Sequence, residues 1–304
     1  MEGELPTDRM SREAQPDFLI IGAMKCATST LHVQLASQSG FHMSEPKEPN
    51  FFSDDEVYAK GMAWYRSLFE GASEDALRGE SSTHYTKLPV HPHTLERLRD
   101  TLGKTPLKLI YVMRHPVDRL VSHYIHEWSQ GVYSGGIAEE VERHPEMMDF
   151  GRYAMQLKPW IEAFGTASIL PVFSDSLRQH PQRTLERVCA FLGHEGAVQW
   201  NHQQGDQNVS AVRMRRSWMR RFAAIGWVRW MRRTFVPVAW RQRVKKRWVM
   251  DERPQLDDAM RAKLEQEFDR DLAELGAMVG MELHCANWKD VAADAEPQWA
   301  TEDA

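Results

Sequence analysis

The stretch FLIIGAMKCATSTLHVQLASQ, residues 18–38, constrains the fold more tightly than any other part of this chain. A short apolar run ends at Gly22, small and hydroxyl-bearing residues follow, and Leu31 and Leu35 then recur at helical spacing. This pattern predicts a buried β-strand at 17–22, a turn and a helix. The amino end of such a helix presents backbone N–H groups and the positive end of its dipole to an anion. The segment therefore predicts a phosphate-binding loop.

The position of Lys25 separates this loop from the most familiar kind. A Walker A loop reads G-x-x-x-x-G-K-[ST] and binds Mg²⁺ through its Ser or Thr, but Lys25 follows Gly22 by three residues and has no glycine before it. Thr28, Ser29 and Thr30 add hydroxyl donors. Two interpretations stay open at this point: an anion site, or an ordinary turn in which Thr28 or Ser29 caps the helix.

A second candidate anion site stands at the end of another apolar run. LKLIYVMR (107–114) predicts a buried strand, and it ends in Arg114 where a Walker B strand would place a magnesium-binding Asp. The helix expected at 116–130 begins with proline and carries Ser122. Ligands bind at the carboxyl ends of strands in open α/β sheets, so Arg114 and Ser122 predict a second phosphate site. The alternative is that Arg114 pairs with Asp118.

The other elements alternate between strands and helices along the chain. This alternation predicts an α/β fold with a P-loop-like open parallel β-sheet flanked by helices. From about residue 212 onward the pattern is mostly helical, which we interpret as helices packed around the same sheet. The expected elements are strands at 17–22, 107–114 and 168–173 and helices at 28–38, 56–70, 92–102, 116–130 and 184–193.

The length of 304 residues is enough for one large α/β domain. We expect a disordered start at 1–16, a single domain at 17–285 with helices at 212–284, and a frayed acidic tail at 286–304. No run approaches the length of a membrane-spanning helix, and the start lacks the apolar core of a signal peptide.

The cysteines bear on the cellular setting. Cys26, Cys189 and Cys285 are widely spaced and odd in number, so they indicate neither a disulfide framework nor a zinc site. A reducing, cytoplasmic setting is therefore expected.

Five motifs follow one another in the first two thirds of the chain. They are GAMKCATSTL, SEPKEPNFF, YAKGMAWYRSLF, GESSTHYT and YVMRHPVDRLVSHY. Over roughly residues 15–215 they resemble the sulfotransferases that use 3′-phosphoadenosine 5′-phosphosulfate, above all the heparan-sulfate-type branch and its bacterial relatives. This resemblance implies that Arg114 and Ser122 bind the 3′-phosphate and that no metal is needed. It implies a 5′-phosphosulfate site at Lys25, Cys26, Ala27, Thr28, Ser29 and Thr30.

The motif KEPNFF (47–52) supplies a candidate general base. The residue before a proline is restricted toward extended geometry, so we expect Glu48 to be extended and aimed at a cleft. By resemblance Glu48 is the catalytic base, and Lys47 assists the transferring sulfuryl group. Without the resemblance, a solvated loop with alternating charges is the simpler interpretation. Lys25 would neutralise the charge that grows on the leaving oxygen.

The motif GESSTHYT (79–86) departs from the heparan-type pattern, which has a lysine where this chain has Ser81. That departure leaves the identity of the acceptor open. Glu80 and His84 are candidates on the substrate side, and His84 is the alternative base. The segment QNVSAVR (207–213) resembles a loop that closes over the nucleotide in bacterial members, which makes Arg213 a further donor-site candidate. Asn208 and Ser210 are weaker candidates in the same loop.

Residues 207–250 contain 13 Lys or Arg and no Asp or Glu, whereas the rest of the chain carries 25 basic and 43 acidic side chains. Five of the 11 tryptophans also lie here, at 213–250. The segment either covers an edge of the core with arginine stems and tryptophans or makes peripheral contact with an anionic membrane or glycan. A membrane contact would place the protein at the inner face. The rest of the chain is acidic and shows no nucleic-acid module, so nucleic acid is not expected as a partner.

Three functions are compared on these residues. A sulfotransferase acting on a carbohydrate, glycolipid or other small-molecule acceptor accounts for both anion sites and for Glu48. A P-loop kinase would need a Walker glycine and a metal-binding acid, and this chain has neither. A non-catalytic protein that binds anions or membranes does not explain why Lys25, Glu48, Arg114 and Ser122 occur together. We therefore expect a sulfotransferase.

Overall fold

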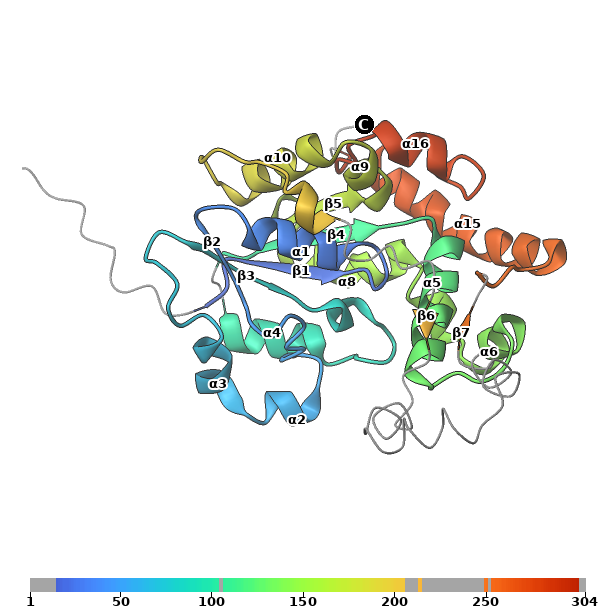
Figure 1. Cartoon of the computed structure of the whole chain (residues 1–304), viewed down its shortest axis with the longest axis horizontal. Helices are drawn as coiled ribbons and strands as arrows, with labels where there is room; N and C mark the ends of the chain where they lie inside the picture. Colours follow the sequence, from blue (N-terminus) through green and yellow to red (C-terminus); the bar gives the residue numbers. More distant parts are fainter. Residues whose placement is uncertain (1–14, 104–105, 206–212, 215–248, 251–252, 301–304) are drawn as a thin grey trace, which may run out of the picture.

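The computed structural model describes residues 15–103, 106–205, 213–214, 249–250 and 253–300. A five-stranded sheet in the order β2-β3-β1-β4-β5 forms its centre (Figure 1). Every neighbouring pair in this sheet is parallel. This architecture confirms the expected open parallel sheet. The strands are β1 (Phe18–Gly22), β2 (Phe41–Met43), β3 (Leu77–Ser81), β4 (Lys108–Met113) and β5 (Ile169–Phe173).

Three of these strands are the apolar runs that the sequence singled out. All side chains of β1 and β5 are buried, as are those of β4 after its first residue. β1 lies between β3 and β4, so Leu19 stands opposite Glu80 on one side and Leu109 on the other. β2 and β3 were not predicted, because FHM and LRGES contain polar residues and no apolar run.

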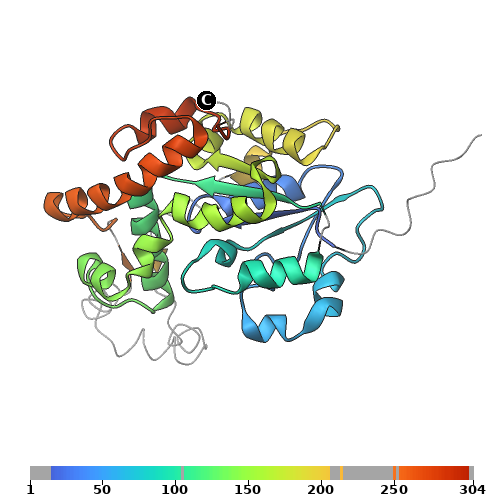
Figure 2. The ribbon, with the colours of Figure 1, turned by 180° about the vertical axis from the view of Figure 1, so that it is seen from behind.

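Helices cover both faces of the sheet. In Figure 1, α9 and α10 lie above it, α1 lies in front of it, α4 lies below it with α2 and α3, and α5 stands at the end toward which the strands run. Seen from behind, α8 crosses in front of the sheet with α15 packed against it (Figure 2). The helices are α1 (Thr28–Ala36), α2 (Asp55–Tyr58), α3 (Gly61–Ser67), α4 (Thr94–Leu102), α5 (Pro116–Gln130), α6 (Ile137–Arg143), α7 (Glu146–Asp149), α8 (Tyr153–Phe164), α9 (Ser174–Gln179), α10 (Pro181–Leu192), α11 (His202–Gly205), α15 (Asp258–Val279) and α16 (Trp288–Asp294), with 3₁₀ turns η1 (Thr83–Thr86) and η2 (Thr166–Ser168).

The helix expected at 56–70 is two helices. α2 ends at Tyr58 and α3 begins at Gly61, whose φ of 79° is left-handed and interrupts a continuous helix. The break turns the aromatic side chains of this region inward, where Tyr65 stacks on Phe51 with ring centroids 4.5 Å apart.

The carboxyl-terminal stretch packs against the core, so the expectation of a frayed tail is wrong for residues 286–300. Trp288 is completely buried, and its ring centroid lies 5.1 Å from that of Phe173 at the end of β5. Ser176 Oγ donates to the carbonyls of Ala292 and Ala295. The packing of this stretch was not predicted, because its overall composition is acidic although apolar groups anchor it.

Two calls of the sequence analysis lie mostly outside the described residues. These are the disordered start at 1–16 and the basic, tryptophan-rich segment at 213–250. The described part of that segment pairs Arg213–Met214 (β6) with Val249–Met250 (β7) as a short antiparallel ladder. This ladder departs from the mostly helical expectation after residue 212. Within the described ranges, no helix is both long and apolar enough to cross a membrane.

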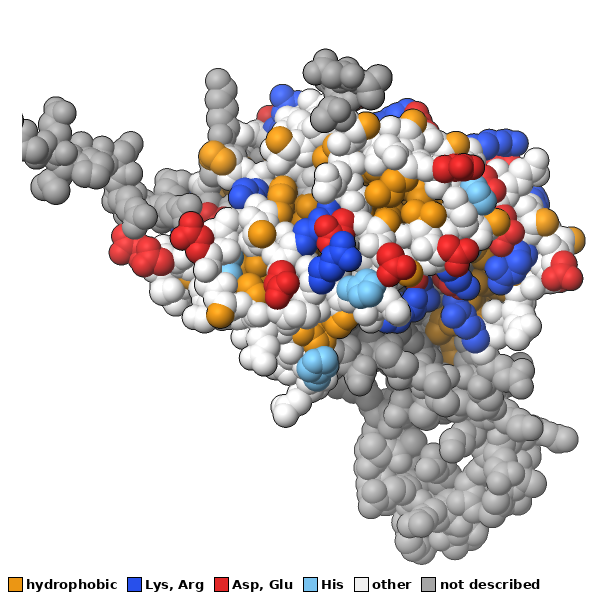
Figure 3. Space-filling model, turned by 90° about the horizontal axis from the view of Figure 1, so that it is seen from above, with side chains coloured by type: hydrophobic (Ala, Val, Ile, Leu, Met, Phe, Trp, Pro, Cys, Tyr) orange, Lys and Arg blue, Asp and Glu red, His pale blue; other side chains and the backbone are white. Residues whose placement is uncertain are grey.

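The face over α9, α10 and α16 carries mixed charge. Figure 3 shows acidic and basic side chains interspersed across it. Several are paired: Arg183 Nε lies 2.6 Å from Glu296, and His180 Nε2 lies 2.6 Å from Asp294. These pairs tie α10 and the turn before it to the carboxyl-terminal stretch. A face of this kind has no broad field of one sign to attract a polyanion.

Candidate active site

The carboxyl ends of β1, β3 and β4 lie side by side in the sheet. After β1 the chain runs by way of α1 to β2 at one edge, whereas after β4 it runs toward β5 at the other. The connections therefore diverge between β1 and β4, and this switch point is where ligands bind in open α/β sheets. The loop before α1 and the residue Arg114 meet there, as the sequence predicted.

The first loop has the geometry of an anion site. α1 begins at Thr28, and its N-cap residue is Ala27, with φ 65° and no side-chain cap hydrogen bond. The alternative in which Thr28 or Ser29 caps the helix is therefore wrong. Lys25 is also left-handed, with φ 69°. Left-handed residues help to form the backbone nests that bind anions, and an uncapped helix terminus leaves its first N–H groups for a ligand.

Cys26 anchors this loop to the core of the domain. It is completely buried, and its Sγ lies 3.7 Å from the hydroxyl of Tyr153. That hydroxyl donates to the carbonyl of Arg114 at 2.6 Å, so one tyrosine ties the loop to the end of β4. Burial raises the pKa of the Cys26 thiol to about 11, which makes it a neutral packing group and not a nucleophile. Its backbone N–H donates to Ala23.

Arg114 follows β4 directly and is half-buried. The carboxylate of Asp118 pairs with Arg253, whose Nη2 lies 2.8 Å from it. No ion pair among the described residues includes Arg114, so the expected alternative of an Arg114–Asp118 pair is not seen there. Ser122 lies half-buried on α5, eight residues after Arg114. Arg114 thus reaches the switch point outside any described ion pair, although its charge is close enough to help lower the pKa of Asp118.

The loop that carries Glu48 runs along the end of β3. The N–H of Glu48 donates to Ser81 at 2.9 Å, and that of Asn50 donates to Ser82 Oγ at 3.0 Å. Glu48 is left-handed, with φ 59°, so the expectation of extended geometry before Pro49 is wrong. Its hydrogen bond to β3 accompanies a conformation that the following proline alone would disfavour.

Left-handed backbone at residues other than glycine marks both predicted loops. Within the described residues it occurs at Lys25, Ala27, Glu48 and Asn50. Such conformations cost roughly 1–3 kcal/mol each and cluster at ligand-binding and catalytic sites. The two loops that the sequence selected on chemical grounds are therefore also the places where the fold stores backbone strain.

Glu48 is held as a carboxylate. Lys47 Nζ lies 2.5 Å from Glu48 Oε1, and the two side chains are 24% and 34% exposed, so this is not a freely solvated loop. Burial raises the pKa of Glu48, but the charge and hydrogen bond of Lys47, with Lys87 and His84, outweigh it and leave the pKa below its ordinary value. Glu48 is therefore ionised at neutral pH.

Two residues near Glu48 escaped the sequence analysis. Lys87 is only 8% exposed at the end of η1, and burial lowers its pKa to about 8 despite Glu48 and Glu127. His32 on α1 is buried, and its Nδ1 lies 2.9 Å from Ser81 Oγ. Burial and then Lys47 lower its pKa to about 4. In the sequence, the signal for Lys87 was its place directly after the motif GESSTHYT. Nothing in the sequence marked His32 as a residue of the site.

The two substrate-side candidates fare differently. Glu80 is completely buried, accepts a hydrogen bond from Tyr65, and has its pKa raised by burial. It points to the opposite face of β3 from Ser81, so the expectation that it faces a cleft is not met. His84 is half-buried, and its ring lies 4.7 Å from that of His91. Burial lowers its pKa to about 4, which keeps it neutral near Glu48.

The remaining predictions concern Arg213 and metals. Only the backbone of Arg213 is described, in β6, and Asn208 and Ser210 lie outside the described ranges. In the part of the chain that the structure covers, no group of three or more His, Cys, Asp or Glu side chains is arranged to hold a metal ion.

Comparison with known proteins identifies the family of this chain. The family model described as the sulfotransferase domain matches residues 15–276. Heparan sulfate glucosamine 3-O-sulfotransferase 3A1 of Mus musculus is 29% identical over 197 residues, which cover 62% of this chain and 48% of that protein. Bifunctional heparan sulfate N-deacetylase/N-sulfotransferase 2 of Bos taurus is 27% identical over 199 residues, covering 59% and 22%. The chain thus spans about half the length of the mouse relative.

A solved sulfotransferase from Alicyclobacillus acidocaldarius has the same fold. The TM-score is 0.63 at 22% identity, over 90% of this chain and 99% of that one. Because the family model covers most of its length, the chain belongs to the sulfotransferase family.

Proposed function

We propose that the protein transfers the sulfuryl group of 3′-phosphoadenosine 5′-phosphosulfate. One observation carries the proposal: the uncapped amino end of α1 and Arg114, which is in no described ion pair, stand at the ends of neighbouring strands. A helix terminus binds one phosphate, and a strand-end guanidinium binds another bidentately. A donor with separate 5′ and 3′ phosphates matches two such sites. Magnesium-bound ATP would call for a carboxylate at the position of Arg114.

In the proposed reaction, an acceptor oxygen or nitrogen attacks sulfur in line with the bridging oxygen of the donor. The new bond to sulfur forms as the bond from sulfur to that oxygen breaks. The acceptor proton passes to Glu48, and the electron pair of the broken bond leaves with adenosine 3′,5′-bisphosphate. Lys25 offsets the charge that grows on the leaving oxygen, and Lys47 steadies the sulfuryl group.

For the acceptor we propose a hydroxyl or amine of a carbohydrate, free or carried on a lipid. The support comes from relatives whose names specify heparan sulfate or its glucosamine. Ser81 occupies the position of a lysine in that branch, and its hydroxyl is engaged by His32. That lysine serves the donor or the acceptor in the branch, so this substitution leaves the identity of the acceptor open.

The test is transfer of ³⁵S from labelled donor to a panel of acceptors that includes heparosan oligosaccharides, a glycolipid and a simple phenol. Glu48→Gln should lower the transfer rate by about 10²–10⁴-fold, because a positioned base contributes that much. Glu45→Gln removes an exposed carboxylate from the same loop and should leave the rate near that of the parent. Equal rates in parent and Glu48→Gln would remove Glu48 as the base. A parent that does not bind the donor would overturn the function.

A further inference from the structure

Lys87 is the charged group at the candidate site for which the proposed reaction gives no role. It follows η1 at the carboxyl end of β3, and it is 8% exposed. No ion pair among the described residues includes it. Burying an ammonium without a close counter-ion lowers the stability of a fold, and such groups persist mainly where they serve a site.

The structure holds Lys87 firmly in place. The next residue, Leu88, is clamped by the buried side chain of Gln156, which accepts from its N–H at 2.9 Å and donates to its carbonyl at 2.8 Å. The carbonyl of Lys87 accepts from His91, and its Nζ lies 5.4 Å from the ring centroid of Phe150. A rigid backbone and a ring beneath the ammonium fix the position of its charge.

Glu48 stands at the same end of β3. The hydrogen bonds from Glu48 to Ser81 and from Asn50 to Ser82 bring its loop to the residues just before η1. The charge of Lys87 acts with that of Lys47 to lower the pKa of Glu48, and Glu48 in turn acts on Lys87. The titratable and charged groups that face Lys87 are Lys47 and Glu48 in the loop, His84 and His91 in and after η1, and Arg119, His123 and Glu127 on α5.

We propose that Lys87 is a positioning residue for the candidate base: its buried ammonium, fixed by Gln156 and Phe150, acts with Lys47 to keep the Glu48 carboxylate ionised. This inference rests on the proposed role of Glu48 in sulfuryl transfer. Lys47 is the more exposed of the two lysines, and it is hydrogen-bonded to Glu48. If Lys47 leaves that contact for the sulfuryl group during the reaction, Lys87 stays in place and preserves the charged state of Glu48. The two lysines would then have separate tasks: Lys47 would act on the sulfuryl group, and Lys87 would keep Glu48 ionised.

The test is a pH titration of the Glu48 carboxyl group by ¹³C NMR of protein labelled at the glutamate side-chain carboxyls, with the signal assigned by its loss in Glu48→Gln. Lys87→Met removes a nearby positive charge, so the Glu48 midpoint should rise by about 0.5–1 pH unit. Lys87→Arg should restore the parent midpoint. Lys263→Met, which removes an exposed lysine on α15, makes the same change in net charge and should not move it.

The melting temperature gives the second measurement. Lys87→Met should melt no lower than the parent, because it removes a buried charge without an ion-pair partner among the described residues. An unchanged Glu48 midpoint in Lys87→Met would overturn the inference, as would a large loss of stability with no change in titration. The titration needs neither donor nor acceptor. A failed inference is therefore distinct from a failed function, which would show as a parent that does not bind adenosine 3′,5′-bisphosphate.

Discussion

Three buried or half-buried histidines surround the candidate site, and each is kept neutral. Burial is the largest cause for His32, His84 and His123, and it lowers the pKa of each to about 4. Nearby lysines or Arg119 act in the same direction. Neutral imidazoles leave the charge of the site to lysines, arginine and carboxylates. With a pKa of about 4, His84 has no advantage as a base over the Glu48 carboxylate.

These histidines predict acid sensitivity. Between pH 6.5 and about 4, an unfolded histidine binds a proton that the folded one does not, so the free energy of unfolding falls as the pH is lowered through this window. His123→Phe keeps the ring contacts with Phe150 and Tyr133 and removes one titrating group. From pH 7 to 5 its loss of stability should be smaller than that of the parent by about 2 kcal/mol. Urea denaturation at several pH values measures this.

His202→Phe is the control for that experiment, because His202 is exposed on α11. It should retain the full pH dependence of the parent. A His123→Phe protein whose stability falls as steeply as that of the parent would show that folding does not lower the pKa of His123.

At the scale of elements, the β1–α1 and β4–α5 units were predictable, whereas the β3 region was not. Apolar runs and a proline start mark the former. β3 reads LRGES, and it is a strand because it pairs on both sides, with β1 and β2. The Glu48 loop depends on hydrogen bonds to Ser81 and Ser82, far away in the sequence. The sequence therefore predicted which residue types form the site. It could not predict their pKa values, because these depend on tertiary contacts.

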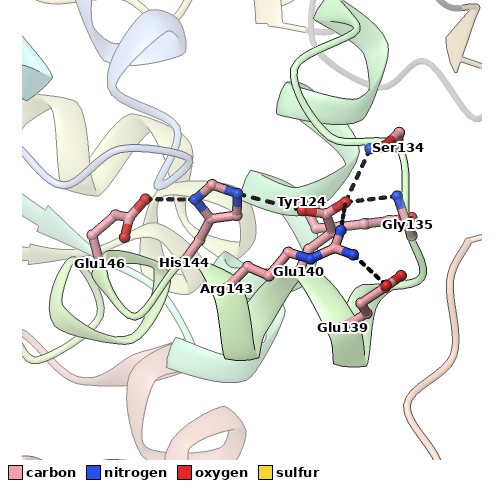
Figure 4. Close-up of polar contacts among 8 residues, drawn as sticks. All are labelled: Tyr124, Ser134, Gly135, Glu139, Glu140, Arg143, His144 and Glu146. Carbon is pink, nitrogen blue, oxygen red and sulfur yellow. Dashed lines mark hydrogen bonds and ion pairs between the residues drawn. The ribbon is translucent and has the colours of Figure 1, made fainter.

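The turn between α5 and α6 depends on one buried carboxylate (Figure 4). Glu140 accepts from the N–H groups of Ser134 and Gly135 at 3.0 and 2.6 Å. Its side chain is 3% exposed and lies 3.4 Å from His144. Tyr124 closes the turn by donating to the carbonyl of Gly135. These contacts hold the turn where the outer end of α5 meets α6.

Glu140→Gln should lower the free energy of unfolding by about 1–3 kcal/mol, because hydrogen bonds to a charged carboxylate oxygen are stronger than those to a neutral amide oxygen. Glu139→Gln, at an exposed neighbour paired with Arg143, should change it by less than about 0.5 kcal/mol. Thermal and urea unfolding of both variants compare them. Equal effects would mean that the buried carboxylate does not support this turn.

At the scale of the whole molecule, the carboxyl-terminal helices complete the domain. Asp271 on α15 accepts from the N–H groups of Ala154 and Met155, both at 3.0 Å, and so caps the amino end of α8. Tyr153 at that same end connects the loop before α1, through Cys26, to the carbonyl of Arg114. Helices distant in sequence therefore support the predicted donor site. Membrane contact through 213–250 and a cytoplasmic location stay predictions.

Binding of adenosine 3′,5′-bisphosphate, measured by thermal shift beside AMP, ADP and Mg-ATP, tests the central claim most directly. The account predicts strong stabilisation by the bisphosphate without metal, of about 2.7 kcal/mol at 100 times its dissociation constant. Arg114→Ala should lose most of this preference, whereas Arg99→Ala, on the exposed side of α4, should retain it. Equal stabilisation by AMP, or a preference for Mg-ATP, would contradict the account.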